Sequence, residues 1–212
     1  MSQVSGLTIP EVLRTLGRDL TMLGADSLAR GDLSRFDVIV VGPRAYEIDP
    51  ALTDWSGRLE VFARAGRTVL VQYQQQAYFG GGFPPFGLSL TDRLDGPVPA
   101  RVSAPRVAEE HAPVRVLSPG HPALHQPNQL AAGDWDGWIQ ERGLYFARAW
   151  APEWEPLLEM ADTGEDPLQG ALLVSRVGNG LYLYTGLSFF RQLPAGVPGA
   201  TRLLLNLLAL RP

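Results

Sequence analysis

Two short apolar runs separated by one amphipathic helix constrain the fold of this 212-residue chain more than any other feature. The first run, residues 36–42, and the second, residues 68–73, are rich in valine and continuous rather than alternating. That pattern is typical of strands buried on both faces of a parallel sheet. Residues 52–65 carry an apolar stripe at helical spacing, formed by Leu52, Trp55, Leu59 and Phe62. The order strand, helix, strand with short connections predicts a right-handed βαβ unit.

The segments on either side of this unit have weaker signals. Residues 10–17 predict a short helix that ends at Gly17. Residues 74–101 contain three consecutive glycines and two consecutive prolines, which predicts a long irregular loop of the kind that often carries function. Residues 114–117 then predict a further short strand.

The C-terminal third changes character and predicts antiparallel pairing. Residues 143–150 and 156–161 are expected to be strands. Gly178-Asn179-Gly180 lies between two apolar runs and predicts a β-hairpin. The leucine-rich residues 199–210 predict a final helix that is apolar almost all round, and such a helix is either packed in the core or covered by a partner.

Composition narrows the class of protein. Apolar residues make up 45% of the chain, enough for the core of one α/β domain over residues 1–212. No apolar run approaches the roughly 20 residues of a membrane span, and no signal peptide is evident, so a cytoplasmic location is expected. The net charge of -4 without a basic stripe argues against nucleic-acid binding. There is no cysteine and no lysine, which excludes disulfides, thiolate nucleophiles, Schiff bases and a P-loop lysine.

Four segments carry a resemblance to a known family: residues 32–46 (DLSRFDVIVVGPRAY), 71–75 (VQYQQ), 135–146 (WDGWIQERGLYF) and 184–196 (YTGLSFFRQLPAG). They resemble the C-terminal accessory domain of some bacterial PIG-L/LmbE-type deacetylase proteins, within the class I glutamine amidotransferase-like superfamily. The resemblance spans nearly the whole chain from about residue 10. It implies a flavodoxin-like, mostly parallel sheet flanked by helices, with a C-terminal antiparallel hairpin.

The chain departs from that family at both catalytic motifs. An amidotransferase of this class places a nucleophilic cysteine after the strand 68–73, where this chain has only tyrosine and glutamine. The deacetylase half carries a Pro-His-Pro-Asp-Asp zinc motif, whereas this chain has Gly120-His121-Pro122-Ala123. The expected first strand is also short, with Val4 and Leu7 alone to form it, so a partner domain is either lost or supplied separately. We therefore predict no catalytic residue, no metal site and no cofactor.

The strongest candidate site lies at the carboxyl ends of the two central strands, where open α/β sheets bind ligands. Gln72 and Gln74 end one strand, and Arg44 and Tyr46 follow the other. The amides are predicted either to contact a ligand or to cap neighbouring loops. Arg44 either binds a carboxylate or phosphate, or pairs with a nearby acidic residue.

The densest cluster of aromatic and charged residues comes later. Trp135, Trp138, Glu141, Arg142 and Tyr145 suit either stacking on a sugar or a core edge with a buried ion pair. Glu141 and Arg142 complete the predicted ligand-binding set. The three histidines lack metal-ligand spacing, and no Gly-x-Ser-x-Gly elbow surrounds any serine.

Three functions follow from this sequence. The first is a non-catalytic accessory domain that binds a carbohydrate or a deacetylase-type protein partner. The second is a hydrolase that uses Glu47 or Glu141 as a general base, which requires a buried carboxylate with a raised pKa. The third is a structural module that forms a homodimer through the final helix.

Overall fold

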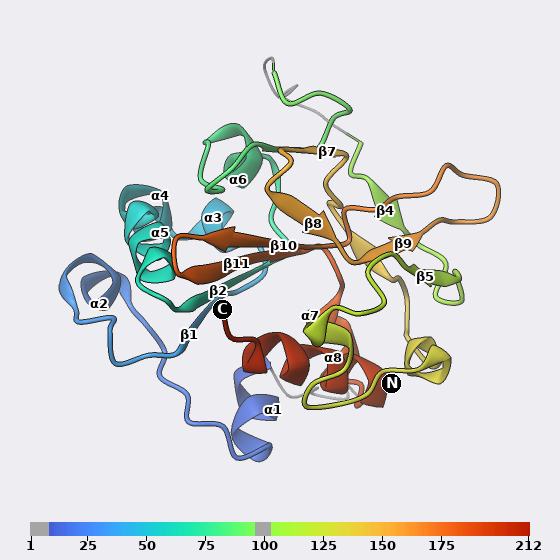
Figure 1. Ribbon diagram of the computed structural model, residues 1–212, viewed down its shortest axis with the longest axis horizontal. Helices are drawn as coiled ribbons and strands as arrows, with labels where there is room; N and C mark the ends of the chain where they lie inside the picture. The colour runs from blue at the N-terminus through green and yellow to red at the C-terminus, as the bar shows by residue number, and fades with distance from the viewer. Residues whose placement is uncertain (1–8, 96–102) are drawn as a thin grey trace, which may run out of the picture.

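The computed structural model describes residues 9–95 and 103–212, and Figure 1 shows them as one mixed sheet flanked by helices. The expected first strand at Val4 and Leu7 lies outside these residues. The main sheet has five strands in the order β1-β2-β11-β10-β8. Their bounds are β1 Val38–Val41, β2 Thr68–Gln72, β8 Trp154–Pro156, β10 Leu172–Val177 and β11 Gly180–Thr185.

Parallel and antiparallel pairing meet inside this sheet. β1 is parallel to β2, and β2 is parallel to β11, as the two valine-rich runs predicted for the start of the sheet. β10 is antiparallel to both β11 and β8. The predicted hairpin at Gly178-Asn179-Gly180 is confirmed as the β10–β11 connection. Gly180 has no room for a side chain, because a Cβ there would lie 1.9 Å from the carbonyl oxygen of Ala63.

Three two-stranded sheets extend the domain beyond β8. They pair β3 (Leu88–Ser89) with β7 (Ala149–Trp150), β4 (Arg106–Val107) with β6 (Gly143–Leu144), and β5 (Val114–Val116) with β9 (Leu158–Met160). The single strand predicted over residues 143–150 is therefore wrong. It is divided into β6 and β7, because Tyr145 adopts a left-handed φ of 54° that ends the extended backbone.

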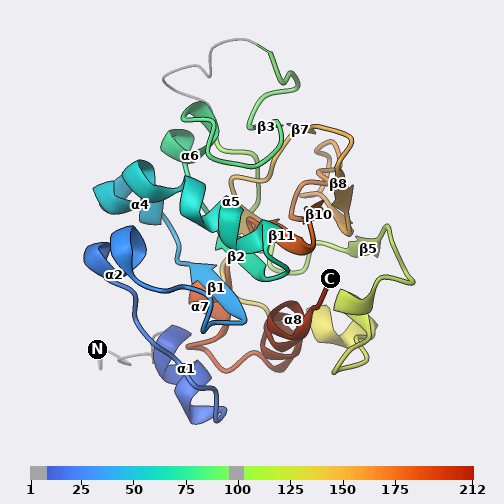
Figure 2. The same ribbon diagram turned by 60° about the vertical axis from the view of Figure 1, so that its left-hand side comes forward.

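Helices cover both faces of the main sheet (Figures 1 and 2). Their bounds are α1 Ile9–Thr15, α2 Ala25–Arg30, α3 Ala45–Ile48, α4 Pro50–Trp55, α5 Gly57–Arg64, α6 Gln76–Gly80, α7 Phe189–Gln192 and α8 Pro198–Ala209. Two 3₁₀ turns, Pro122–Leu124 and Ala132–Trp135, precede β6. Strand β2 divides its side chains between the two cores: Leu70 faces α8, whereas Val69 and Val71 face α5.

Two sequence predictions in this region need correction. The helix expected over residues 52–65 is divided into α4 and α5 at Ser56, and Trp55 remains 43% exposed instead of joining the buried stripe. Glycine at the first position of α5 weakens helical continuity there. The loop expected over residues 74–101 contains α6 and β3, although residues 96–102 lie outside the described part.

The final helix α8 is packed in the core. Leu203, Leu204 and Leu207 are almost fully buried against the main sheet and the 3₁₀ turns. Asn206 is the polar exception on this buried face, with no exposed surface. Its amide accepts from the backbone N–H of Asn128 at 2.9 Å and donates to the carbonyls of Ala123 and Asn128. Within the described residues, no helix combines the length and apolar character needed to span a bilayer.

We predict that Asn206→Ala lowers the free energy of unfolding by about 2 to 3 kcal/mol, because it leaves buried backbone groups of the Ala123–Asn128 turn without partners. Urea denaturation followed by tryptophan fluorescence measures this change. The control Thr201→Ala removes a half-buried hydroxyl from the same helix and should change stability by less than about 0.5 kcal/mol. Equal effects of the two substitutions would contradict the role given to Asn206.

Candidate binding site at the carboxyl end of the parallel strands

The Gln74 side chain joins the ends of β1 and β2. Its Nε2 donates to the carbonyl of Gly42 at 2.7 Å and to the carbonyl of Gln72 at 2.6 Å. Its Oε1 accepts from the backbone N–H of Tyr46 at 3.1 Å, at the start of α3. The side chain is fully buried. Every hydrogen-bonding group of this amide is therefore committed to the main chain, in agreement with the capping alternative for this residue.

Tyr46 and Gln72 are also buried rather than exposed. Tyr46 stacks on Phe83 at 4.9 Å between ring centroids and lies near Tyr78. Gln72 is 1% exposed, and its Oε1 has no hydrogen-bond partner among the described residues. Gln72 lines the cavity beside β1, but its unpartnered Oε1 is buried from solvent.

Arg44 is exposed and begins α3 in a left-handed conformation, with a φ of 56°. Its backbone N–H donates to the carbonyl of Tyr73 at 2.8 Å, which fixes the turn after β1 to the end of β2. Its side chain forms no ion pair with any described residue, neither with Glu47 nor with Asp49. The guanidinium is therefore free for an anionic group of a ligand.

Glu47 lies beneath this turn. One carboxylate oxygen accepts from the backbone N–H of Gln75 at 2.9 Å, and the other is buried without a partner among the described residues. The Gln75 amide donates to the hydroxyl of Tyr73 at 3.0 Å. The end of β2 therefore presents one carboxylate with spare accepting capacity beside one half-buried amide.

Three aromatic rings form a platform beside these polar groups. The ring of Tyr73 lies 5.4 Å from that of Tyr145 and 5.6 Å from that of Phe190, measured between centroids. Tyr145 and Phe190 are half-buried, so each presents part of its surface to solvent. We refer to Tyr73, Tyr145 and Phe190 as the aromatic platform.

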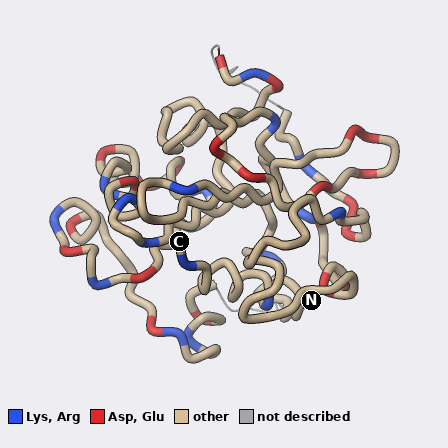
Figure 3. The backbone as a smooth tube through the Cα atoms, in the orientation of Figure 1, with Lys and Arg blue, Asp and Glu red and all other residues tan. Residues whose placement is uncertain are grey.

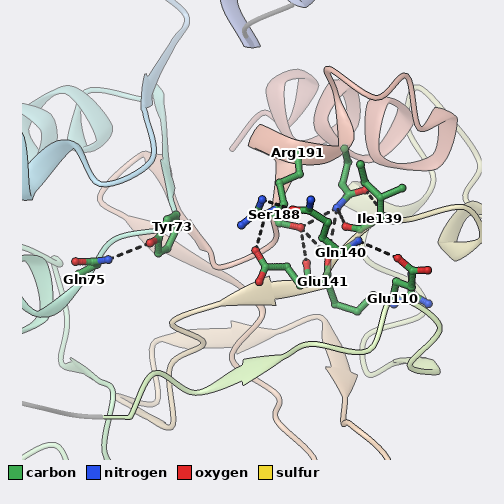
Figure 4. A network of polar contacts seen from close by, with 10 residues as sticks. Tyr73, Gln75, Glu110, Ile139, Gln140, Glu141, Ser188 and Arg191 are labelled. Atoms are coloured by element: carbon green, nitrogen blue, oxygen red, sulfur yellow. Dashed lines mark hydrogen bonds and ion pairs between the residues drawn. The ribbon is translucent and has the colours of Figure 1, made fainter. Parts of the chain in front are cut away.

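Glu141 extends the site on the far side of Phe190. Its carboxylate accepts from Nε of Arg191 at 2.8 Å, and Arg191 also contacts Gln140 and lies over the Phe190 ring. Figure 4 shows this ion pair and its neighbours on one side and the Tyr73–Gln75 contact on the other. Phe190 contacts both groups, so the platform joins them.

Arg142, in contrast, is part of the core. It is 3% exposed and donates to the carbonyls of Ala112 and Trp135. Burial lowers the pKa of its guanidinium. Its guanidinium lies over the Trp138 ring, 5.8 Å from the centroid. Glu141 and Arg142 therefore have different surroundings although they are adjacent in sequence. Glu141 lies at the candidate site, whereas Arg142 is buried and holds the backbone of neighbouring loops.

A cavity adjoins the site along β1. This cavity has a volume of about 1140 Å³ and reaches from α8 and α1 past β1 to Gly42, Gln72 and Phe190. Phe190 thus belongs both to the aromatic platform and to the wall of the cavity. The charged groups of the chain are spread over the surface around both, without a single dominant patch (Figure 3).

The described residues contain no assembled nucleophile or metal centre. Ser188 is buried, and its hydroxyl donates to the backbone carbonyls of Glu141 and Arg142. No group of three or more histidine, aspartate or glutamate side chains in residues 9–95 and 103–212 is placed to hold a metal ion. The His121 ring accepts from the N–H of Ala123 and begins a 3₁₀ turn.

The comparisons with known proteins indicate a fold and no more. No family model matches the chain, and no curated protein is similar to it. A cytoplasmic protein from Salmonella typhimurium superposes with a TM-score of 0.60 at 16% identity, covering 94% of this chain and 83% of that one. A cold-adapted β-galactosidase from Rahnella sp. R3 superposes with a TM-score of 0.50 at 15% identity, covering 93% of this chain but only 26% of the enzyme.

Sequence reasoning named some residues of this site and missed others. Arg44 and Glu141 lie at its surface and Gln72 lies in the adjoining cavity, whereas Tyr46, Gln74 and Arg142 are buried within the fold. The predicted ligand-binding set omitted Tyr73 and Phe190, whereas Tyr145 was named as suited to sugar stacking and Glu47 as a candidate general base. The signal was present, because Tyr73 stands within the Gln-rich run and Phe190 within a quoted segment, but which ring faces solvent depends on the left-handed turn at Tyr145.

We predict that Gln74→Leu lowers the free energy of unfolding by about 3 kcal/mol, because it leaves three buried backbone groups without hydrogen-bond partners. Chemical denaturation of the two proteins measures the difference. Gln76→Leu is the matched control, because its side chain makes no hydrogen bond in the structure, and it should change stability by less than about 0.5 kcal/mol. A Gln74→Leu protein as stable as the control would show that the amide does not join the strands.

The buried tyrosines next to the site predict a loss of stability at alkaline pH. Burial raises the pKa of Tyr46, Tyr78 and Tyr184, and raises that of Tyr182 to about 12. Below pH 10 these phenols are protonated in both the folded and the unfolded chain. Above about pH 10 only the unfolded chain ionises them, so stability falls by about 1.4 kcal/mol per pH unit for each phenol until the folded pKa is reached.

Absorbance at 295 nm, recorded together with near-ultraviolet circular dichroism, tests this expectation. The ionisation of these four phenols should coincide with loss of the folded signal. Tyr46→Phe should reduce the pH dependence of stability above pH 10 by one proton. Reversible ionisation of all six tyrosines near pH 10 in the folded protein would contradict it.

Proposed function

We propose that this protein is a non-catalytic, ligand-binding accessory domain with an amidotransferase-like fold, and that its ligand is a carbohydrate or sugar derivative. The observation that carries the proposal is the aromatic platform, bordered by Glu47 and Gln75 on one side and by the Arg191–Glu141 pair on the other. It lies at the carboxyl ends of parallel strands, where open α/β sheets place their ligand sites.

Gln74 is the residue that supports a non-catalytic function. In the family that the sequence resembles, a reactive side chain follows the strand that corresponds to β2. Here the side chain at that place is an amide, buried and fully hydrogen-bonded to the main chain. An amide is no acyl acceptor, and this one makes no contact with a histidine that would serve as a base.

The chemistry of the platform favours a sugar. A pyranose ring has an apolar C–H face that packs on an aromatic ring, and hydroxyls at its rim that pair with carboxylates and amides. The half-buried Gln75 amide pairs with such a hydroxyl, and the exposed Arg44 accommodates an anionic substituent. This combination is why neutral and phosphorylated sugars are the first ligands to test.

The sequence resemblance favours a PIG-L-type deacetylase domain as a partner, whether joined to this chain or separate. A cytoplasmic location agrees with the description of the Salmonella protein of similar fold. A homodimer through α8 is not favoured, because the apolar face of that helix is already covered within the chain.

A hydrolase that uses Glu47 is the second candidate, and the unpartnered carboxylate oxygen is the observation that favours it. Glu141 is a poorer general base, because its carboxylate is held by Arg191 at 2.8 Å. Release of p-nitrophenol from a panel of p-nitrophenyl glycosides separates the candidates. The binding proposal expects none above background, whereas release that Glu47→Gln abolishes would establish the hydrolase.

A glycan array followed by isothermal titration tests the binding proposal. We expect at least one sugar or sugar phosphate to bind. Replacement of the two half-buried rings, Tyr145→Ala with Phe190→Ala, should weaken that binding at least roughly tenfold through loss of stacking. Trp55→Ala, which removes an exposed ring from α4, should leave it unchanged. No binding to any sugar, or binding that survives loss of both rings, would contradict the proposal.

A further inference from the structure

Strand β1 is an edge of the main sheet, with hydrogen-bonding groups free on one side. Thr68 donates its backbone N–H to the carbonyl of Asp37 at 3.2 Å. Since backbone groups alternate in direction along a parallel strand, those of Ile39 and Val41 also face β2, and those of Val38 and Val40 face away. Val38 and Val40 make no backbone hydrogen bond to another described residue.

A second stretch of extended chain lies opposite this edge. Residues 18–24 connect α1 to α2 without regular secondary structure, and Figure 2 shows them on the outer side of β1. The backbone N–H groups of residues 19–23 make no hydrogen bond to the rest of the described chain. The cavity of about 1140 Å³ is lined by both of these segments. It therefore has unpaired backbone on two opposite walls, as a missing strand would leave.

The other walls carry leucines together with polar and charged residues, among them Gln72, Asp49, Arg35 and Arg211. Leu205 and Leu208 of α8 and Leu20 of the connecting segment line the cavity. Gln72 lines the end that lies nearest the aromatic platform, and its buried Oε1 has no partner among the described residues. A purely hydrocarbon ligand would leave both backbone edges unsatisfied, whereas a peptide supplies donors and acceptors for them.

The amino-terminal end of β1 is positively charged. Arg35 precedes this strand, and Arg211 follows Leu210, whose carbonyl accepts from the hydroxyl of Thr68 beside Val38. Both arginines line the cavity, and neither forms an ion pair with a described residue. Asp37 in the same place is already paired with Arg67 at 2.9 Å. An occupant is therefore complementary if it carries acidic residues at this end.

We propose that this cavity binds an extended polypeptide strand, which adds to β1 by β-augmentation, with apolar residues in its middle and acidic residues at the end beside Arg35 and Arg211. The site is independent of the sugar-binding proposal. Edge-to-edge pairing with the sheet of a second copy is disfavoured, because residues 18–24 line the same cavity on the outer side of β1 and obstruct the approach of another sheet.

The probe is a peptide that copies β2, the strand already paired with the other edge of β1. Its sequence is acetyl-Glu-Glu-Thr-Val-Leu-Val-Gln-amide, and the readout is amide hydrogen exchange by NMR. We expect the amides of Val38 and Val40 to exchange readily in the peptide-free protein and at least roughly tenfold more slowly with peptide bound. The amides of Ile39 and Val41, already paired with β2, should be protected in both states.

Four controls make the proposal falsifiable. A Lys-Lys leader in place of Glu-Glu, or the protein variant Arg35→Glu with Arg211→Glu, should weaken binding by roughly fivefold, whereas Arg30→Glu outside the cavity should not. A peptide with Thr-Pro-Leu-Pro-Gln in the middle should not bind, because proline lacks the N–H. Equal binding of the proline peptide would overturn strand pairing. Slow exchange of the Val38 and Val40 amides without peptide would also overturn the proposal. If that protection depends on protein concentration, a second copy occupies the cavity; if it does not, another part of this chain occupies it.

Discussion

One buried amide decides how the functional end of this domain is built. Gln74 holds the carbonyls of Gly42 and Gln72 and the N–H of Tyr46, so it fixes the turn after β1, the end of β2 and the start of α3 in a single arrangement. Buried backbone groups must be paired, and no other side chain reaches all three. The positions of the exposed Arg44, the half-buried Glu47 and the buried Tyr73 follow from this pairing.

A consequence is that recognition and reaction are separated at this edge. Gln74, which stands where the family that the sequence resembles carries its reactive residue, is fully hydrogen-bonded to the main chain. The groups around it that lack such partners are aromatic rings, one carboxylate oxygen of Glu47 and the guanidinium of Arg44. In the proposed function these groups contact the ligand without forming a covalent bond to it. Phe190 and Gln72 then connect this surface to the cavity along β1, so the domain offers two neighbouring sites of different chemistry.

Sequence patterns predicted the elements that depend on local periodicity. The two valine-rich strands, the glycine-turn hairpin and the leucine-rich helix α8 follow from spacing alone. The division of residues 143–150 did not, because the left-handed backbone at Tyr145 is imposed by tertiary contacts such as the Tyr184 hydroxyl bound to the Tyr145 carbonyl. The sequence predicted a site at the carboxyl ends of β1 and β2, but it did not separate the exposed Arg44 from the buried Gln74, because both side chains are polar and their burial differs only in the folded chain.

The central claim is that Gln74 is structural and the surface around it recognises a ligand. The side-chain NH₂ resonances of Gln74, observed by ¹⁵N-edited NMR, test it most directly. We predict that these two protons exchange with water far more slowly than those of the half-buried Gln76, and that sugar binding shifts the resonances of Gln75 while leaving those of Gln74 in place. Rapid exchange at Gln74, or a ligand contact at its amide, would contradict it.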